Sequence, residues 1–266
     1  MKRDPGEADI SRRVGIGFAT MAVLVALWFL LTTLTGTIGG GRFPSPGEFW
    51  ASLLQISGKG YAGATLLSHA WHSTTLVVMG FLVAIGTGVP LGLWMGWSRR
   101  AEALMNPIFL FIRPIPPLAW IPLAILWLGL GDAAKIMVIW FAAFVPSVIN
   151  AFTGVRTIDR PVLEAAAMLG TPRWRLVQEV ILPAALPMIF TGLRLSLQAA
   201  WTTLVAAELV GALVGVGFVL NVAQQDIYPG MILVGMVTVG VLGWATTWLL
   251  GHAERRALAW NVAAGA

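Results

Sequence analysis

Long apolar runs separated by short polar segments dominate this sequence. The runs cover about residues 14–34, 73–97, 106–130, 133–153, 186–212 and 230–251. Each run is long enough to cross the hydrocarbon core of a bilayer as an α-helix, which takes about 20 residues. The pattern therefore predicts an all-α membrane protein with six transmembrane helices.

The first apolar run is followed by a long polar connection. Residues 14–34 exceed the apolar core of a signal peptide and are long enough to cross a bilayer, so we interpret them as an uncleaved first span. In the connection, Ser45 is a suitable N-cap for a short helix over about 46–56, which we expect to lie at the outer membrane interface. Residues 1–72 then form a tail, one span and a periplasmic loop.

Lysine and arginine are distributed unevenly over the two sides that six spans define. With the N-terminus inside, the inner segments hold Lys2, Arg3, Arg12, Arg13, Arg99, Arg100, Arg156, Arg160, Arg173, Arg175, Arg255 and Arg256. The outer segments hold Arg42, Lys59 and Lys135. Basic residues concentrate on the cytoplasmic side of membrane proteins, so both termini are expected to be cytoplasmic. Residues 154–185 then form the largest cytoplasmic loop, and 256–266 a cytoplasmic tail.

A first short helix is predicted inside the polar segment 156–183. Asp159 is its N-cap, Pro161 lies in its first turn, and Gly170 ends it. Its surface carries three alanines at 165–167, which allow another surface to approach closely. Such a short helix is marginal in water by itself. Docking onto a partner and serving as a plain connector therefore explain the local pattern equally well.

A second short helix is predicted to follow directly. Thr171 is expected to cap it, Pro172 to occupy its first turn, and Pro183 to limit its end. The segment thus reads as two short helices joined by a tight turn, placed between two membrane-length apolar runs.

Composition agrees with a membrane protein and excludes several kinds of chemistry. Of the 266 residues, 58% are hydrophobic and 11% charged, and the mean hydropathy is +0.81. A soluble domain contains about 25% charged residues. The chain has no cysteine, which excludes disulfides, thiolate metal sites and thiol catalysis. The net charge of +5 does not indicate nucleic-acid binding, because the basic residues lie at the ends of apolar runs.

The third apolar run contains a cluster of prolines. Its prolines are Pro114, Pro116, Pro117 and Pro122, and they cannot all lie in a regular helix. Non-helical backbone at membrane depth is tolerated only inside protein or along a water-filled cavity. We therefore expect residues 113–122, Trp120 included, to be internal and to line a passage.

The second apolar run contains glycines at a spacing of four residues. Gly88, Gly92 and Gly96 form a stripe that lets another helix approach closely. We favour helix packing over a direct ligand role for these glycines.

Charged residues inside the spans are functional hypotheses because they are costly there. Arg113 precedes the proline cluster and either guides an anionic substrate or snorkels to the inner interface, whereas Arg194 is expected to snorkel. Glu208 either gates the outer mouth or pairs with Lys135, and we favour the pair.

No catalytic or metal site is predicted. His69 and His72 are three residues apart, but no third ligand lies near them in the sequence, and we expect them to be solvated in the outer loop. No Ser-His-Asp set and no paired carboxylates occur. The phosphate-binding pattern GxxxxGK[ST] is also absent from the sequence, so ATP would have to be bound by a partner.

The polar segment resembles the EAA motif of the membrane subunits of bacterial ABC importers. The matching residues are Glu164, Ala165, Ala166, Gly170, Val180, Leu182 and Pro183, with Val180 where the family prefers isoleucine. The stretches "RPIPPLAWIPLAILWLGLGDAAKI", "FTGLRLSL", "LVAAELVGA" and "ERRALAW" resemble the branch that serves nitrate, sulfonate, taurine and bicarbonate importers. The similarity extends from about Thr74 to Trp260.

This resemblance implies a type I importer permease fold over residues 73–255, in the bacterial inner membrane. It implies a homodimer working with two cytoplasmic ATPase subunits, which bind ATP and Mg, and with a periplasmic solute-binding protein. The 164–170 helix would be the coupling helix, which inserts into a groove of the ATPase. The coupling residues implied are Glu164, Ala165, Ala166, Gly170, Arg173, Leu182 and Pro183. The candidates for the translocation path are Arg113, Pro114, Pro117, Trp120 and Glu208.

The function expected is alternating-access import of a small anion, such as a sulfonate or nitrate. One rival is a channel or secondary carrier that works without an ATPase, and another is a membrane-embedded enzyme. The carrier would need an ionisable network inside the membrane, and the enzyme would need a reactive constellation, which the sequence does not contain.

Overall fold

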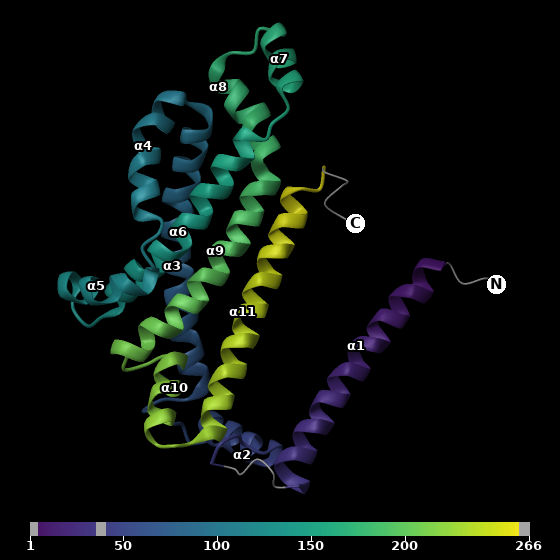
Figure 1. The fold of residues 1–266 in the computed structure, drawn as a ribbon, viewed down its shortest axis with the longest axis vertical. Coiled ribbons are helices and arrows are strands. Elements are labelled where there is room, and N and C mark those ends of the chain that lie inside the picture. Colours follow the sequence, from purple (N-terminus) through teal and green to yellow (C-terminus); the bar gives the residue numbers. More distant parts are fainter. Residues whose placement is uncertain (1–4, 36–40, 261–266) are drawn as a thin grey trace. The chain divides into compact units, whose positions relative to one another are not determined.

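The structure is a computed structural model that describes residues 5–35 and 41–260, with side chains from residue 15 onward. Lys2, Arg3 and residues 261–266 of the expected cytoplasmic tails lie outside the described residues, as do the side chains of Arg12 and Arg13. The chain forms two compact units (Figure 1). The terminal unit comprises Met1–Thr65 and Val219–Met236, and the central unit comprises Leu66–Phe218 and Val237–Ala266.

The terminal unit begins with a long helix and contains the predicted interfacial helix. Its elements are α1 (Pro5–Phe29), the π-helical segment η1 (Leu30–Leu34), α2 (Pro46–Gly58), most of α10 (Val216–Gln225) and the first turns of α11 (Pro229–Ala257). The Ser45 hydroxyl accepts the N–H of Glu48, and the Glu48 carboxylate accepts the N–H of Ser45. This capping box fixes the start of α2, so the helix predicted over 46–56 is confirmed.

Side-chain hydrogen bonds join distant segments of the terminal unit. The Ser52 hydroxyl donates to the Tyr228 hydroxyl at 3.0 Å, and the Tyr61 hydroxyl donates to the Asp226 carboxylate at 2.5 Å. A Cβ on Gly230 would overlap the Ser52 hydroxyl oxygen, so α2 and the start of α11 meet closely there. The sequence patterns did not predict α10 or these contacts.

The central unit contains the remaining helices. They are α3 (Leu66–Trp97), α4 (Arg99–Ile112), the 3-10 turn η2 (Pro117–Trp120), α5 (Ile121–Leu128), α6 (Asp132–Arg156), α7 (Arg160–Met168), α8 (Arg173–Arg175), the π-helical segment η3 (Leu176–Ile181), α9 (Leu182–Gly211) and the rest of α11. Helix α6 lies against both α3 and α9, while α4 packs on α3 and α5 on α6. Apolar side chains of the three long helices form the core, including Val77, Ile139 and Leu204, which are fully buried.

Six spans are present when the third is allowed to bend. Five helices in the described chain are long and apolar enough to cross a membrane: Gly15–Leu34, Leu66–Trp97, Asp132–Arg156, Arg173–Gly211 and Pro229–Ala257. The sixth candidate is the pair Arg99–Ile112 and Pro117–Leu128, which is bent by 84°. The all-α class and the six apolar runs are confirmed, whereas the side of the membrane on which the termini lie stays a prediction.

The glycine stripe faces α6 across a very short distance. A Cβ added to Gly88 would lie 2.9 Å from the Ser147 Cβ, and one on Gly92 would lie 2.5 Å from the Val148 carbonyl oxygen. A Cβ on Gly96 would lie 2.6 Å from the Val155 Cβ. The α3 and α6 backbones therefore approach so closely that only glycine fits between them.

The second short helix predicted in the polar segment was wrong in its extent. Pro172, rather than Thr171, occupies the cap position, and Pro183 does not end the helix. Instead α8, η3 and α9 form one continuous helix, Arg173–Gly211, of 39 residues. A proline ring clashes with the carbonyl four residues earlier in an α-helix, and the wider π-helical turns of η3, directly before Pro183, relieve that clash.

Candidate functional site

Helix α7 projects from one end of the central unit, beyond the long helices (Figure 1). Asp159 occupies its N-cap position and Pro161 its first turn, as predicted, although the Asp159 side chain makes no capping hydrogen bond. At the other end Gly170 has a φ of +69°. The N–H of Gly170 bonds to the Ala167 carbonyl, and the N–H of the next residue bonds to the Ala166 carbonyl. This is a Schellman C-cap, which explains why a glycine ends the helix.

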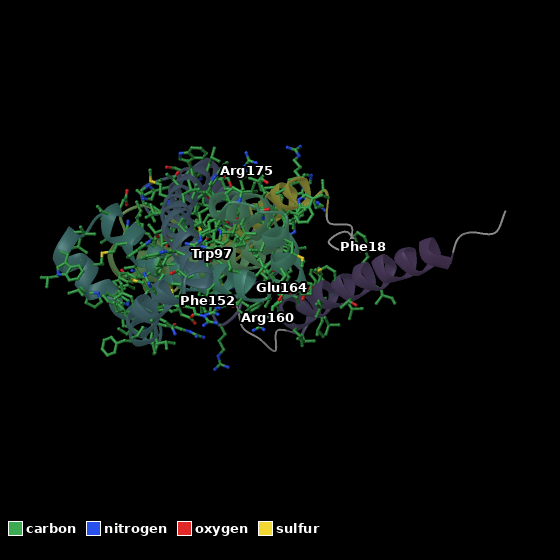
Figure 2. The ribbon with its side chains drawn as sticks, turned by 90° about the horizontal axis from the view of Figure 1, so that it is seen from above. Phe18, Trp97, Phe152, Arg160, Glu164 and Arg175 are labelled. Atoms are coloured by element: carbon green, nitrogen blue, oxygen red, sulfur yellow. The ribbon has the colours of Figure 1, made fainter. Side chains whose placement is uncertain are left out.

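The two faces of α7 have different surroundings. Ala166 is buried and Leu163 packs against a cluster of α6 and α9 side chains. Val162, Ala165 and Leu169 lie on the adjoining side of the helix at spacing i, i+3, i+7, and Leu169 is 85% exposed. Met168 beside them is 90% exposed. We call Val162, Ala165, Met168 and Leu169 the outer stripe of α7. Glu164 is also exposed (Figure 2).

The inner face of α7 is tied to two spans. The cluster that receives Leu163 contains Val155 from α6, Ile181 from η3 and Ile189 from α9, with Leu176 and Val177 at its edge. The packed side chains of this cluster therefore connect α7 to α6 and α9. Of the predicted coupling residues, Arg173 and Leu182 are exposed, whereas Ala166 faces inward.

The proline-rich break separates α4 from α5, as predicted. Helix α4 ends at Ile112, and η2 begins at Pro117. Within this chain, however, the break is not internal, because Arg113, Pro114 and Leu118 are exposed. The expectation of burial was wrong at the level of a single chain, since α4 packs mainly on α3, α5 packs on α6 and α9, and many other side chains of α4 and α5 are exposed.

A pocket of about 160 Å³ lies at the break. Its lining residues are Ile112, Arg113, Ile115, Pro117, Trp120, Phe141, Ala142, Val145 and Pro146. The Trp120 and Phe141 rings stack at 4.2 Å between centroids and 11° between planes. Arg113, Pro117 and Trp120, which the sequence suggested as passage residues, thus meet at one pocket, whereas Glu208 does not line it.

Glu208 is fully buried and is not paired with Lys135, so the favoured interpretation was wrong. Its carboxylate accepts the Ser73 hydroxyl and the N–H of Gly217, both at 2.7 Å. The Lys135 ammonium lies 3.1 Å from the Asp132 carboxylate instead. Asp132, three positions before Lys135 on α6, is therefore the charge partner of this lysine.

Three successive N–H groups of the loop after α9 bond to side chains of α3 and α9. The N–H of Gly215 donates to His69 Nδ1 at 3.0 Å, that of Val216 to the Ser73 hydroxyl at 2.9 Å, and that of Gly217 to Glu208. A Cβ on Gly217 would lie 2.7 Å from the Glu208 Cβ, so the loop approaches α9 closely. We call Glu208, Ser73, His69 and these N–H groups the Glu208 cluster. Sequence reasoning missed Ser73 and both glycines, because single small residues carry no pattern.

The histidines belong to α3 rather than to an outer loop. Helix α3 begins at Leu66, and His69 is fully buried, so the expectation of solvation was wrong for it. His72 Nε2 lies 3.3 Å from the Asp132 carboxylate. Among the described residues, no group of three or more His, Cys, Asp or Glu side chains could hold a metal ion.

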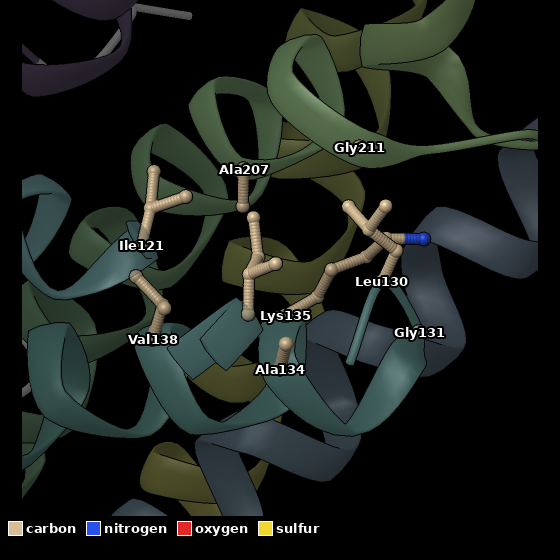
Figure 3. A pocket seen from close by; sticks show the side chains of 9 residues that line it. Ile121, Leu130, Gly131, Ala134, Lys135, Val138, Ala207 and Gly211 are labelled. Carbon is tan, nitrogen blue, oxygen red and sulfur yellow. The ribbon is translucent and has the colours of Figure 1, made fainter. Parts of the chain in front are cut away.

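Lys135 lines a second, much smaller pocket, shown in Figure 3. Residues of α5, α6 and α9 meet around it, including Ile121, Val138 and Ala207. Its volume of about 10 Å³ is too small for any solute larger than one water molecule. This pocket therefore reflects packing rather than a solute site.

These features define a multi-pass helical membrane protein with a short amphipathic helix at one end and a broken span. Residues 88–258 match the family described as binding-protein-dependent transport system inner membrane component. The chain belongs to this family and is an ABC importer permease subunit.

Curated relatives cover most of the chain. The taurine transport system permease protein TauC of Escherichia coli (strain K12) is 36% identical over 253 residues, 95% of this chain and 92% of that protein. The putative aliphatic sulfonates transport permease protein SsuC of Bacillus subtilis (strain 168) is 34% identical, covering 92% of this chain and 87% of that protein. The bicarbonate transport system permease protein CmpB of Synechococcus elongatus is 36% identical, over 67% of each chain.

A solved structure shares the fold. A chain of the MetNI methionine ABC transporter, solved in inward-facing conformations, matches with a TM-score of 0.59 at 22% identity. The match covers 72% of this chain and 93% of that chain. The type I importer permease fold is thereby confirmed.

Proposed function

We propose that this chain is the membrane subunit of an ATP-driven importer for a small anion, most simply a sulfonate. It works as a homodimer with two cytoplasmic ATPase subunits, which bind ATP and Mg, and a periplasmic solute-binding protein. The names of the relatives, which refer to taurine, aliphatic sulfonates and bicarbonate, support a small anionic solute. Membership of the binding-protein-dependent family supports the partners.

The outer stripe of α7 is the observation that carries the coupling role. An exposed apolar face on a short helix is typical of a protein contact. Met168 and Leu169 are 90% and 85% exposed, while Leu163 on the other face is packed into the α6 and α9 core. The contact with the ATPase is therefore made by the side of Val162, Ala165 and Leu169, next to the buried Ala166.

The mechanism follows from the two faces of α7. Closure of the ATPase subunits on ATP moves α7, and the packing of Leu163 passes this movement to α6 and α9. A movement shared by the two spans changes which side of the membrane the passage opens to. Hydrolysis resets the arrangement.

Charged substitutions on the outer stripe test this proposal. Leu169→Asp and Met168→Asp remove exposed apolar contacts without disturbing the core, so the permease inserts normally. We expect ATPase subunits to co-purify poorly with either variant and their stimulation by the solute-binding protein to be lost. Leu213→Asp is the matched control, because Leu213 is 84% exposed in the loop after α9. Normal ATPase binding and stimulation with both α7 variants would contradict the coupling role.

The cap of α7 offers a second test of the same role. Gly170→Ala places a side chain in the left-handed region, which costs about 1 kcal/mol and loosens the end of the helix. We expect weaker ATPase stimulation with normal insertion for this variant. The same assay on Glu164→Ala reports whether the exposed carboxylate contributes to the contact.

The rival proposal of a carrier without an ATPase makes the opposite prediction. A partner ATPase that binds but cannot hydrolyse ATP should stop uptake if the importer mechanism holds. Continued solute accumulation by that complex in proteoliposomes would favour the channel or secondary carrier.

A further inference from the structure

We propose that the pocket at the α4–α5 break is a solute subsite, in which Arg113 and Trp120 bind the oxyanion group of the transported solute. The inference rests on the proposed function, namely that the solute is a small anion. It goes beyond it by assigning where in the membrane the anionic group is recognised.

Three cations in the spans of the central unit are paired with carboxylates. Lys135 pairs with Asp132 within α6. Arg156 of α6 pairs with Glu102 of α4, and Arg194 of α9 pairs with Glu254 of α11. The expectation that Arg194 snorkels stays a prediction, since its side chain is half-exposed and pairs with a carboxylate near the end of α11.

Arg113 has no such partner. Among the described side chains it makes neither a hydrogen bond nor an ion pair. An unpaired cation within a span is costly. A transported anion would relieve that cost each time it occupied the pocket.

Depth argues against snorkelling of Arg113 to the α7 end of the membrane. Helix α4 has 14 residues, Arg99–Ile112, so Arg113 lies about 21 Å along the helix from Arg99. The α4 helix runs beside α3, away from the α7 end (Figure 1). The hydrocarbon core is about 30 Å thick. Arg113 is thus too far from the α7 end for its side chain to reach that interface.

The lining of the pocket offers hydrogen-bond donors and no competing carboxylate. The guanidinium of Arg113 is a planar fork of donors that matches an oxyanion. The indole N–H of Trp120 can only donate, and among the described residues it has no acceptor. The other lining side chains are apolar, and those of Ile112, Ile115 and Phe141 suit a short carbon chain.

The size of the pocket is compatible with such a solute. A water molecule occupies about 30 Å³ of the liquid, so 160 Å³ corresponds to about five waters. A small oxyanion or a two-carbon amino sulfonate fits this space. The stacking of Trp120 on Phe141 fixes one wall of the pocket in position.

The test measures uptake of radiolabelled taurine and ATP hydrolysis together, in proteoliposomes containing the full complex. Arg113→Gln removes the positive charge. Arg113→Lys keeps the charge but lacks the planar guanidinium, and Trp120→Phe keeps an aromatic ring but lacks the indole N–H. Arg100→Gln is the matched control, since Arg100 is an exposed arginine in the first turn of the same helix.

We expect Arg113→Gln to lower uptake about 10- to 100-fold, the range for losing a charge-assisted hydrogen bond. ATP hydrolysis stimulated by the solute-binding protein should stay near the wild-type rate, because the coupling helix is untouched. Arg113→Lys should recover part of the uptake, Trp120→Phe should lower it several-fold, and Arg100→Gln should leave it unchanged.

Three outcomes would overturn the subsite. They are wild-type uptake by Arg113→Gln, an equal loss of uptake in Arg100→Gln, and a parallel loss of assembly and ATP hydrolysis in Arg113→Gln, which indicates a structural role. Failure of the wild-type complex to accumulate taurine or bicarbonate would instead overturn the proposed function, and the subsite with it.

Discussion

At the level of single side chains, the buried carboxylate of Glu208 needs hydrogen-bond partners inside the membrane. A carboxylate without partners in a span is costly, and Glu208 is fully buried. The Ser73 hydroxyl and the N–H of Gly217 supply its hydrogen bonds. The same carboxylate therefore holds the start of α10 against α3 and α9.

Substitutions of Glu208 should separate its hydrogen bonds from its charge. Glu208→Ala leaves the Gly217 N–H and the Ser73 hydroxyl without this acceptor, at a cost of about 1–3 kcal/mol for each group left unpaired. Glu208→Gln keeps an acceptor oxygen and should lose less. The measurement is the fraction of purified complex that stays folded after heating in detergent. Thr202→Ala, at an exposed position of the same helix, is the control. Wild-type heat resistance in Glu208→Ala would show that the cluster contributes nothing to stability.

Sequence reasoning located Glu208 but assigned the wrong partner. The charge stands out in an apolar run, so it could be found. Ser73 lies 135 positions earlier, and nothing in a lone serine indicates what it will contact. The partner of Lys135, by contrast, is Asp132, three positions away on the same helix, and that proximity could have been read from the sequence.

At the level of elements, the contact between α3 and α6 depends on glycines, which have no side chain to keep the two backbones apart. Bilayer lipids are as apolar as leucine, so helices in a membrane associate through close packing rather than through the hydrophobic effect. The stripe Gly88, Gly92 and Gly96 gives α3 a flat face against α6. The spacing of four residues allowed the stripe to be recognised, but the sequence did not indicate which helix would lie against it.

Two alanine substitutions in α3 form a matched pair. Gly92→Ala would place a Cβ 2.5 Å from the Val148 carbonyl oxygen, and backbone cannot move aside cheaply. We expect it to destabilise the permease by about 1–3 kcal/mol, as overpacking does. Gly86→Ala, with nothing within 4 Å of its Cβ, should be neutral. Folded yield and the rate of thermal inactivation measure both, and equal values for the two variants would contradict the packing role.

The hydrogen bond between Tyr61 and Asp226, called here the tie, should contribute to stability in a pH-dependent way. Burial raises the pKa of the Tyr61 hydroxyl above its usual value, and the hydrogen bond and the negative charge of Asp226 raise it further. The folded state therefore holds this proton more tightly than the unfolded chain does. The contribution of the tie to stability is complete below about pH 10 and is lost as the pH rises through the raised pKa.

Comparison with Tyr61→Phe measures this dependence. The wild type should resist heat better than the variant at about pH 8, and the difference should shrink above about pH 10. A difference that stayed constant up to about pH 11 would indicate that ionisation of Tyr61 is irrelevant to the tie.

Prolines show where element prediction works and where it does not. The cluster at Pro114, Pro116 and Pro117 predicted a break, and the structure has one. Three residues without a backbone N–H cannot make the hydrogen bonds that would continue the α-helix. Pro183 predicted a helix end that does not occur. A single proline can be accommodated by a local change of helix type, which no sequence rule used above anticipates.

At the level of the whole molecule, the number of spans and the fold could be read from apolar run lengths and from the EAA resemblance. The bend of the third span and the exposure of its break could not, because both depend on which surfaces the other helices cover. Many side chains of α4 and α5, including Phe111 and Leu126, are exposed in the single chain.

The absence of cysteine from the sequence makes the orientation directly measurable. Lys59→Cys is expected on the periplasmic side and Arg175→Cys on the cytoplasmic side, and both positions are exposed. A membrane-impermeant maleimide should label the first variant in intact cells and the second only after the membrane is opened. Arg255→Cys should behave like Arg175→Cys. The reverse pattern would place the termini outside and remove α7 from the ATPase.

The π-helical segment η3 makes the number of residues between α7 and the membrane as important as their identity. A π-helical turn contains more residues than an α-helical one, and each residue of an α-helix turns the chain by about 100°. Inserting one residue between 176 and 181 would therefore rotate α8, and α7 with it, by about 100° relative to α9, whereas a deletion is absorbed when the wide turns become regular α-helix. The outer stripe would then face a different direction while every side chain in it stayed the same. For this chain, an insertion in η3 is as severe a change as any substitution in α7.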